Sequence, residues 1–246
     1  MKVPEKKKIV CIIPARYGST RLPGKPLIQI KGVPLIMWTY RQAVESQAFD
    51  AIYVATDDTR IRDTVNTHGG EALMTSPDHT SGTDRVHEAM QNIPGDYVVN
   101  IQGDEPQIPI DMLKVFAEDL EKLDNFSLLT CVTNATIEDM HNSNVVKAVL
   151  NARQEALYFS RAPIPHGRDD TQYTGYKHIG IYGFSRESLE KFCSFEQGRL
   201  ERVEKLEQLR ALEYGMTIHC LINDYSGIGI DTKEDLDTFR LTVEGH

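Results

Sequence analysis

Apolar runs rich in Ile, Val and Tyr alternate with amphipathic segments in the first part of the chain. Such nearly continuous runs predict buried strands, and they occupy residues 8–14, 51–56 and 96–102. Segments with the apolar spacing of a helix lie between these runs, at residues 34–46, 60–68 and 84–91. Strands and helices that alternate in this way are typical of a parallel sheet covered by helices.

The pattern changes after about Pro106. One more helix is predicted at residues 112–123, and short strand-like runs follow it, at residues 127–132, 145–150, 156–160 and 178–184. Runs separated by such short breaks favour antiparallel pairing. No linker rich in Pro, Gly or Ser divides the chain, and no internal repeat occurs. We therefore expect one compact α/β unit, with a mostly parallel central sheet flanked by helices and a smaller antiparallel lobe that binds substrate.

The last part of the chain predicts a helix, a strand and a final helix. Residues 199–214 predict one long amphipathic helix, whose apolar side carries Leu200, Val203, Leu206 and Leu209 or Ala211. A strand at residues 217–223 leads to the Gly-rich segment GIGID, which ends at Asp231 and precedes the last helix.

The charge of the chain excludes one class of function. The 246 residues include 27 Lys and Arg against 36 Asp and Glu, a net charge of −9. A protein that binds nucleic acid without regard to sequence is normally basic, because counterion release from phosphates drives that binding. With 40% hydrophobic and 26% charged residues, the composition is that of an ordinary globular protein. We expect no nucleic-acid partner.

The sequence also bears on compartment and on cysteine chemistry. No segment approaches the roughly 20 apolar residues of a membrane span, and the apolar run at residues 9–13 is too short for a signal peptide. We therefore expect a cytoplasmic protein without membrane insertion. No CxxC pair occurs, and each cysteine lies in or beside an apolar stretch, which predicts small buried hydrophobes. These residues are Cys11, Cys131, Cys193 and Cys220.

A basic, Gly-containing loop occupies residues 14–26, with the sequence PARYGSTRLPGKP. It lies between the first strand and the first helix, where open α/β sheets bind ligands. Gly18 and Gly24 let the backbone turn sharply and approach an anion closely. Positive charge is concentrated here, at Arg16, Arg21 and Lys25. Several cations and exposed backbone amides suit a triphosphate, although an ordinary basic turn is the alternative.

The spacing of this loop excludes two common phosphate-binding classes. The dinucleotide pattern GxGxxG is absent, and five residues separate Gly18 from Gly24 where a P-loop has four. Pro26 follows Lys25, in the place where a P-loop carries Ser or Thr. Neither a dinucleotide-binding dehydrogenase nor a P-loop kinase fits.

Carboxylates follow two of the predicted elements. Asp104, in NIQGDEP, comes just after a buried strand and is well placed to hold a divalent cation against phosphates. Glu105 points elsewhere if the segment stays extended. Asp231 precedes the last helix, where a helix N-cap is the more common role for Asp. Asp57 and Asp58 also follow a strand, and either is suited to cap the helix that begins near residue 60.

Eight motifs, spread from Pro14 to Leu236, occur in one order: PARYGSTRLPGKP, ATDD, SGTDR, NIQGDEP, ALYFSR, KHIGIYGF, LEQLR and GIDTKEDL. The series resembles the 3-deoxy-manno-octulosonate (Kdo) cytidylyltransferases, or CMP-Kdo synthetases. The first motif is shared with other cytidylyltransferases, whereas ALYFSR and LEQLR narrow the resemblance to Kdo. The resemblance implies a Rossmann-like fold of the nucleotide-diphospho-sugar transferase type, a homodimer, and the reaction of CTP with Kdo to CMP-Kdo and pyrophosphate for lipopolysaccharide.

The resemblance also implies a role for particular residues. Asp104 and Asp231 would ligate Mg²⁺, which replaces the N-cap interpretation of Asp231, and with Arg16 and Lys25 they would form the catalytic set. Residues expected near CTP are Ala15, Arg16, Ser19, Arg21, Lys25, Ser81, Arg85 and Gln102. Residues expected near the sugar are Gln102, Arg161, His178, Tyr182, Glu207 and Gln208.

The residues expected near the sugar differ in how strongly their chemistry supports a role in sugar binding. An Arg such as Arg161 suits the sugar carboxylate, because its guanidinium can bond both oxygens at once. Alternatives stay open for three others: Tyr182 as core, His178 as a structural histidine, and Glu207 as a solvated edge position.

By the same resemblance, residues 1–107 mainly bind the nucleotide, residues 108–220 mainly bind the sugar and form the dimer, and residues 221–246 return to the main sheet with a metal ligand. The segment at residues 161–176 is a place where the sugar preference can differ, so 8-amino-Kdo or a sialic-type sugar is the alternative substrate. A glycosyltransferase with a DxD motif is disfavoured, because Glu105 and Pro106 follow Asp104. A non-catalytic nucleotide sensor would not need paired metal carboxylates.

Overall fold

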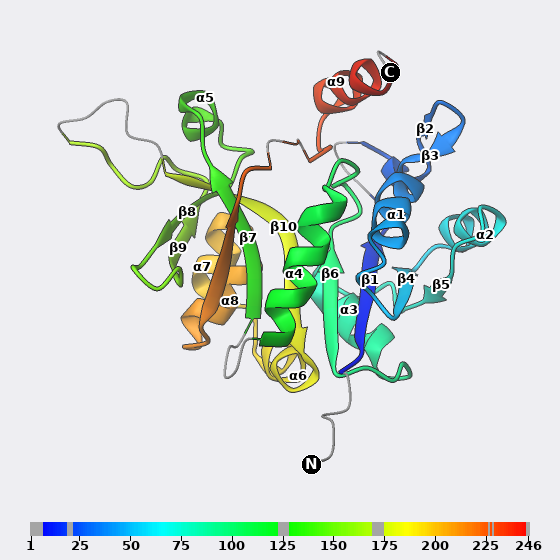
Figure 1. Cartoon of the computed structure of the whole chain (residues 1–246), viewed down its shortest axis with the longest axis horizontal. Helices are drawn as coiled ribbons and strands as arrows, with labels where there is room; N and C mark the ends of the chain where they lie inside the picture. The colour runs from blue at the N-terminus through cyan, green and yellow to red at the C-terminus, as the bar shows by residue number, and fades with distance from the viewer. Residues whose placement is uncertain are drawn as a thin grey trace. The chain divides into compact units, whose positions relative to one another are not determined.

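The computed structural model describes residues 7–18, 22–122, 128–168, 175–225, 227 and 229–244. Two compact units make up the chain: residues 1–121 with 227–246 form the first, and residues 122–226 form the second. Their elements are labelled in Figure 1. None of the described helices combines the length and the apolar character that a membrane crossing requires.

The first unit contains a parallel sheet with the strand order β6-β1-β4-β5 (Figure 1). Its strands are β6 (Tyr97–Ile101), β1 (Ile9–Ala15), β4 (Ala51–Thr56) and β5 (Ala72–Met74). β1 pairs in parallel with β4 and β6, and β4 pairs in parallel with β5. Because β1 and β6 are almost entirely buried, their sequences are continuous apolar runs rather than alternating ones. The three predicted strands are confirmed, whereas the short strand β5 was not predicted.

Helices lie between these strands or follow them, as the sequence predicted. They are α1 (Leu35–Ser46), α2 (Thr59–Thr67), α3 (Gly82–Met90), α4 (Ile110–Lys122) and α9 (Lys233–Glu244). The Asp58 side chain accepts a hydrogen bond from the Arg60 amide and so caps α2, as expected, while Ser81 caps α3 by accepting from the Asp84 amide. A single 3-10 turn, η1 (Lys25–Leu27), and a small hairpin of β2 (Gln29–Ile30) and β3 (Val33–Pro34) precede α1.

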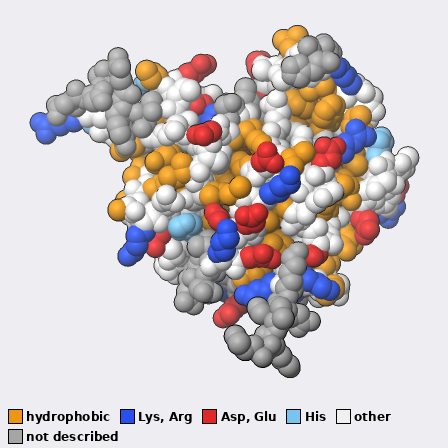
Figure 2. Space-filling model, viewed as in Figure 1, with side chains coloured by type: hydrophobic (Ala, Val, Ile, Leu, Met, Phe, Trp, Pro, Cys, Tyr) orange, Lys and Arg blue, Asp and Glu red, His pale blue; other side chains and the backbone are white. Residues whose placement is uncertain are grey.

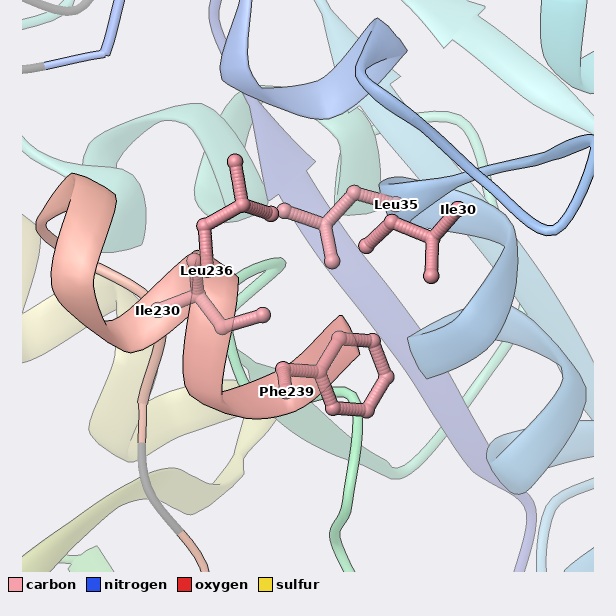
Figure 3. Close-up of a cluster of buried hydrophobic side chains, with 5 residues drawn as sticks. All are labelled: Ile30, Leu35, Ile230, Leu236 and Phe239. Atoms are coloured by element: carbon pink, nitrogen blue, oxygen red, sulfur yellow. The ribbon is translucent and has the colours of Figure 1, made fainter. Parts of the chain in front are cut away.

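A cluster of buried apolar side chains anchors α9 within the first unit. Figure 3 shows its members, which come from β2, α1, α9 and the segment before α9: Ile30, Leu35, Ile230, Leu236 and Phe239. The Trp38 ring packs edge-on against Phe239, with 5.6 Å between ring centroids. Burying one large apolar side chain stabilises a fold by about 1.5–3 kcal/mol. The cluster therefore holds the start of α9, and with it Asp231, in place.

The second unit is mainly antiparallel. β10 (Tyr176–Ser185) pairs antiparallel with β7 (Leu128–Asn134) and β8 (Lys147–Leu150), and β8 pairs antiparallel with β9 (Ala156–Ser160). These pairings confirm the prediction of an antiparallel lobe. One pair departs from it, because β11 (Ile218–Asn223) lies parallel to β7.

The described residues of this unit form four helices: α5 (Ile137–His141), α6 (Arg186–Ser194), α7 (Arg199–Glu204) and α8 (Gln208–Glu213). The prediction of one continuous helix at residues 199–214 was wrong. The helix ends at Lys205, whose φ of 57° is left-handed, and α8 begins after it. Val203 is 73% exposed, whereas Leu206 and Leu209 are buried, so the expected apolar side does not exist along α7.

Buried charges account for this break. Glu201 and Arg210 form an ion pair of 2.7 Å with both side chains almost fully buried. The Glu213 carboxylate accepts hydrogen bonds from the Leu200 and Glu201 amides at the start of α7. These contacts require α7 and α8 to fold back on each other. A Cβ on Gly198 would lie 1.9 Å from the Glu213 carboxylate, so a larger residue there would displace that carboxylate from the amides that donate to it.

The burial of the cysteines and the mixed charge of the surface bear on two further predictions from the sequence. Cys11, Cys131 and Cys220 are buried as predicted, Cys193 is half-buried, and none of the four forms a disulfide. Burial raises the pKa of the Cys220 thiol to about 12, which makes it a poor nucleophile. Figure 2 shows charged side chains of both signs scattered over the displayed face, where the described residues form no extended basic patch.

Candidate active site

Three charged side chains converge in the first unit. The Lys25 ammonium lies 2.7 Å from an Asp104 carboxylate oxygen and 3.3 Å from one of Asp231. It also donates a hydrogen bond of 2.8 Å to the Ile230 carbonyl. Lys25 of the basic loop and the two carboxylates that the sequence singled out therefore form one site.

Local backbone structure positions each of these three side chains. Gly24, with a left-handed φ of 67°, donates its amide to the Tyr17 carbonyl and closes the basic loop, so that Lys25 begins η1. Asp104 follows the end of β6. The Ile230 amide donates to the Asp104 carbonyl at 2.8 Å, which ties the segment before α9 to the end of β6. That backbone bond, together with the apolar cluster around Ile230, places Asp231 beside Asp104.

The electrostatics of this site favour a cation. Burial alone would lower the pKa of Lys25, but the charges of Asp104 and Asp231 and their hydrogen bonds outweigh it and raise that pKa. The lysine is therefore protonated, and the three groups carry one negative charge in excess. Carboxylate oxygens of both aspartates already converge on one cation, the ammonium, and oxygen is the donor that Mg²⁺ prefers.

The protein supplies only part of a metal coordination shell here. Among the described residues, no group of three or more His, Cys, Asp or Glu side chains could hold a metal ion. A divalent cation at Asp104 and Asp231 would take its other ligands from substrate phosphates and water, as is usual for Mg²⁺ at phosphate sites. The residues present fit that arrangement.

Contacts not predicted from the sequence hold the basic loop. The Arg60 guanidinium stacks 3.4 Å from the centroid of the Tyr17 ring, and it bonds both oxygens of Asp58 at 2.9 and 2.6 Å. Tyr17, near the beginning of the loop, is thus held against the start of α2. Arg16 is exposed and Ala15 is buried at the end of β1. Two further predicted ligands of the triphosphate, Ser19 and Arg21, lie outside the described residues.

The remaining residues expected near the nucleotide lie at the start of α3 and the end of β6. A Cβ on Gly82, next to Ser81, would lie 3.5 Å from the Gln102 amide, so these two segments touch. Arg85 is buried and donates to the Thr75 hydroxyl at 2.5 Å and to Asp57 at 3.1 Å. The Arg85 side chain is therefore bonded within the protein and braces the ends of β4 and β5.

In the second unit, three of the residues expected near the sugar form a cluster. The Tyr182 hydroxyl donates to the Gln208 side-chain carbonyl at 3.2 Å, and the His178 and Tyr182 rings lie 5.3 Å apart. Gln208 is 3% exposed, and its amide nitrogen is buried without a hydrogen-bond partner. A buried donor without an acceptor is costly, so this amide is a ready donor to a bound ligand.

The protonation of His178 follows from its neighbours. Burial lowers the pKa of His178 to about 3, so the imidazole is neutral near pH 7. The Thr130 hydroxyl donates to the Ile181 carbonyl at 2.7 Å, and its oxygen lies 2.8 Å from His178 Nε2. Since its one proton is used, that oxygen accepts from Nε2–H. Nδ1 is then an acceptor, suited to a sugar hydroxyl and too weakly basic for proton abstraction.

Arg161 directly follows β9, and backbone carbonyls hold its side chain. Its Nε donates to the Glu204 carbonyl at 2.9 Å and its Nη1 to the Ser143 carbonyl at 3.1 Å. The Glu204 carboxylate accepts from the Arg161 amide at 2.9 Å. Glu207 lies immediately before α8 and is half-buried. The bonds from Nε and Nη1 fix the direction of the Arg161 guanidinium.

Comparison with known proteins identifies the class. The cytidylyltransferase family model matches residues 10–218. A solved CMP:2-keto-3-deoxy-manno-octonic acid synthetase complexed with CTP superposes with a TM-score of 0.91 at 38% identity, covering 97% of this chain and 99% of that one. The chain therefore has the predicted α/β fold of the nucleotide-diphospho-sugar transferase type, and it is a nucleotidyltransferase. It belongs to the cytidylyltransferase family.

Two sequence relatives act on different sugars. The chain is 45% identical to the 3-deoxy-manno-octulosonate cytidylyltransferase of Thermodesulfovibrio yellowstonii, in an alignment that covers 93% of this chain and 95% of the relative. It is 44% identical to the 8-amino-3,8-dideoxy-manno-octulosonate cytidylyltransferase of Shewanella frigidimarina, with 96% of this chain and 98% of the relative covered. Overall similarity does not separate these two activities.

Proposed function

We propose that the chain transfers CMP from CTP to the anomeric hydroxyl of Kdo, giving CMP-Kdo and pyrophosphate for lipopolysaccharide synthesis in the cytoplasm. The observation that carries this proposal is the convergence of Lys25, Asp104 and Asp231 in the first unit. A triphosphate needs cations from the protein, and a phosphate-bound divalent ion needs carboxylates. This site offers both. We also propose that the enzyme works as a homodimer.

The reaction is a direct displacement at phosphorus. The anomeric hydroxyl attacks the α-phosphorus in line, and pyrophosphate leaves from the opposite side without a covalent enzyme intermediate. Lys25 and Arg16 bind the triphosphate and offset its charge. Asp104 and Asp231 hold Mg²⁺. Mg²⁺ held by these two carboxylates would neutralise phosphate charge and favour deprotonation of the attacking hydroxyl.

The residues around the nucleotide orient it. In the proposal, Ser81 and Gln102 contact CTP where α3 begins and β6 ends, and Gln102 also contacts the sugar. Arg85 lies near the nucleotide and keeps this edge of the unit rigid through its bonds to Asp57 and Thr75. Rigid placement matters, because phosphoryl-type transfer depends on positioning and charge rather than on covalent chemistry by the protein.

The second unit recognises the sugar. Arg161 binds the carboxylate, because its charge and planar donors match a carboxylate. His178 Nδ1 accepts from one sugar hydroxyl, and the unpartnered Gln208 amide donates to an oxygen. Tyr182 holds Gln208, and Glu207 is a further hydroxyl ligand. The cluster of His178, Tyr182 and Gln208 is neutral, so it selects a polyhydroxylated ligand by its pattern of hydrogen bonds rather than by charge.

The alternative substrate is 8-amino-Kdo. It differs from Kdo at one position, where an ammonium donates hydrogen bonds but accepts none. The experiment is pyrophosphate release from CTP and Mg²⁺, with Kdo, 8-amino-Kdo and sialic acid offered separately. Release with Kdo supports the proposal, whereas release with 8-amino-Kdo alone moves the assignment to that sugar. CTP binding without release for any sugar would overturn the enzymatic proposal in favour of a nucleotide sensor.

A further inference from the structure

Lys147 in β8 is a fully buried charge that the proposed reaction does not use. Its ammonium donates to three backbone carbonyls: Asn142 at 2.8 Å, Val145 at 2.6 Å and Arg161 at 2.6 Å. All three of its N–H bonds are thereby used. Lys147 forms no ion pair with any of the described residues. A buried ammonium bound only by carbonyl dipoles is expensive, so its presence calls for a function.

The Arg161 guanidinium contacts the two backbone carbonyls that lie, along the chain, between the Asn142 and Val145 carbonyls bound by Lys147. Its Nη1 donates to the Ser143 carbonyl at 3.1 Å and lies 3.5 Å from that of Asn144. Residues 142–145 are therefore held by two cations, with Lys147 on the outer carbonyls and Arg161 on the inner ones. The third bond of Lys147 goes to the carbonyl of Arg161 itself. Lys147 thus fixes both the backbone of Arg161 and the segment on which its guanidinium rests.

We propose that Lys147 is a positioning residue for Arg161, and through it for recognition of the sugar carboxylate. This inference rests on the proposed function. An arginine that binds a carboxylate with two parallel bonds needs a fixed direction. Lys147 supplies that direction by fixing the backbone on both sides of the guanidinium, and it does so without contacting the ligand.

The charges around Lys147 agree with this role. Burial first, and then the positive charge of Arg161, lower the pKa of Lys147, while Glu204 and Asp139 act in the opposite direction. Two cations thus lie close enough to repel each other. An anionic ligand beside Arg161 would relieve that repulsion. This arrangement favours an acid sugar over its neutral analogue.

The test compares two lysines that lie opposite each other in the sheet. Lys147→Met removes the three bonds while it keeps a long, unbranched side chain. Lys177→Met is the matched control, because Lys177 lies opposite Lys147 in the β10–β8 register and pairs instead with Asp139 at 3.3 Å. Loss of bonds to a charged group predicts a rise of about tenfold or more in KM for the sugar in Lys147→Met. KM for CTP should not change, and Lys177→Met should change neither constant.

A second readout separates positioning from a general structural role. We expect the preference in kcat/KM for the acid sugar over its methyl ester to shrink in Lys147→Met, as it does in Arg161→Ala. Equal rises in both Michaelis constants, or an unchanged preference, would overturn the inference. If Lys147→Met does not fold, the ¹⁵N signal of the buried Lys147 ammonium in the wild type decides: it should shift on addition of sugar and not on addition of CTP, and no response to sugar contradicts the role.

Failure of the inference and failure of the proposed function are distinguishable. If Arg161→Ala raises KM for the sugar and Lys147→Met does not, the inference on Lys147 is wrong and the proposed function stands. If Arg161→Ala leaves KM for the sugar unchanged, the proposed role of Arg161 itself is wrong.

Discussion

The two units use charge in opposite ways. In the first, Lys25 bonds directly to the carboxylates of Asp104 and Asp231. In the second, Lys147 bonds only to backbone carbonyls, and the nearby cluster around His178 is neutral. The first arrangement can exchange one cation for another, whereas the second keeps its charge in a fixed place. We therefore expect the first site to respond to metal ions, and the second to the carboxylate, shape and hydrogen-bond pattern of its ligand.

The largest expected effect comes from breaking the first arrangement. Asp104→Asn keeps the size of the side chain and removes its charge, so kcat should fall on the order of 10³-fold while the protein stays folded. Steady-state pyrophosphate release and circular dichroism measure the two properties. The control is Asp111→Asn, whose carboxylate is 94% exposed at the start of α4. Turnover near the wild-type value in Asp104→Asn would exclude a metal role.

Substitution of Lys25 should separate nucleotide binding from metal binding. In Lys25→Met the two carboxylates lose their internal cation, so Mn²⁺ added without nucleotide should bind more tightly than it does to the wild type. CTP should bind about 10–100-fold more weakly, because one cation for the triphosphate is lost. Electron paramagnetic resonance of free Mn²⁺ and calorimetry with CTP test both directions. Weaker binding of Mn²⁺ would show that the lysine does not compete with the metal.

The second unit should respond to pH through His178. Its pKa of about 3 in the folded protein lies below the ordinary value of 6.5, so the unfolded chain binds a proton first as pH falls. This contribution to stability is complete above pH 6.5 and is lost as pH falls toward 3. Between pH 7 and about pH 4.5, the free energy of unfolding of the wild type should fall on the order of 2–3 kcal/mol more than that of His178→Asn. Urea unfolding at each pH gives the two curves, and parallel curves would contradict the buried neutral state.

The sequence predicted the first unit better than the second. Strands such as β1 and β6 are buried on both faces, so their apolar runs are unambiguous. The break at Lys205 could not be predicted, because no glycine or proline marks it and because Glu201 and Arg210 resemble exposed helix residues until their ion pair is seen. β5 has three residues, too few to show a period.

The candidate site was predictable to the extent that its determinants are local. Lys25 and Asp104 lie in motifs whose chemistry can be judged from neighbouring residues. Asp231 was different: its local pattern favours a helix cap, and its proximity to Asp104 depends on a backbone bond between segments far apart in the chain. Lys147 was not singled out, because a lysine in an apolar strand resembles a solvent-facing position until the carbonyls around it are known.

The bond between the Ile230 amide and the Asp104 carbonyl has a consequence for synthesis of the protein on the ribosome. A nascent chain exposes Lys25 and Asp104 early, but it lacks Asp231 and the α9 cluster until most of the chain has been translated. A polypeptide that ends between Arg161 and Asp231 would still contain Lys25, Asp104 and Arg161. It would lack the Asp231 carboxylate, and we expect it to bind substrates without turning them over.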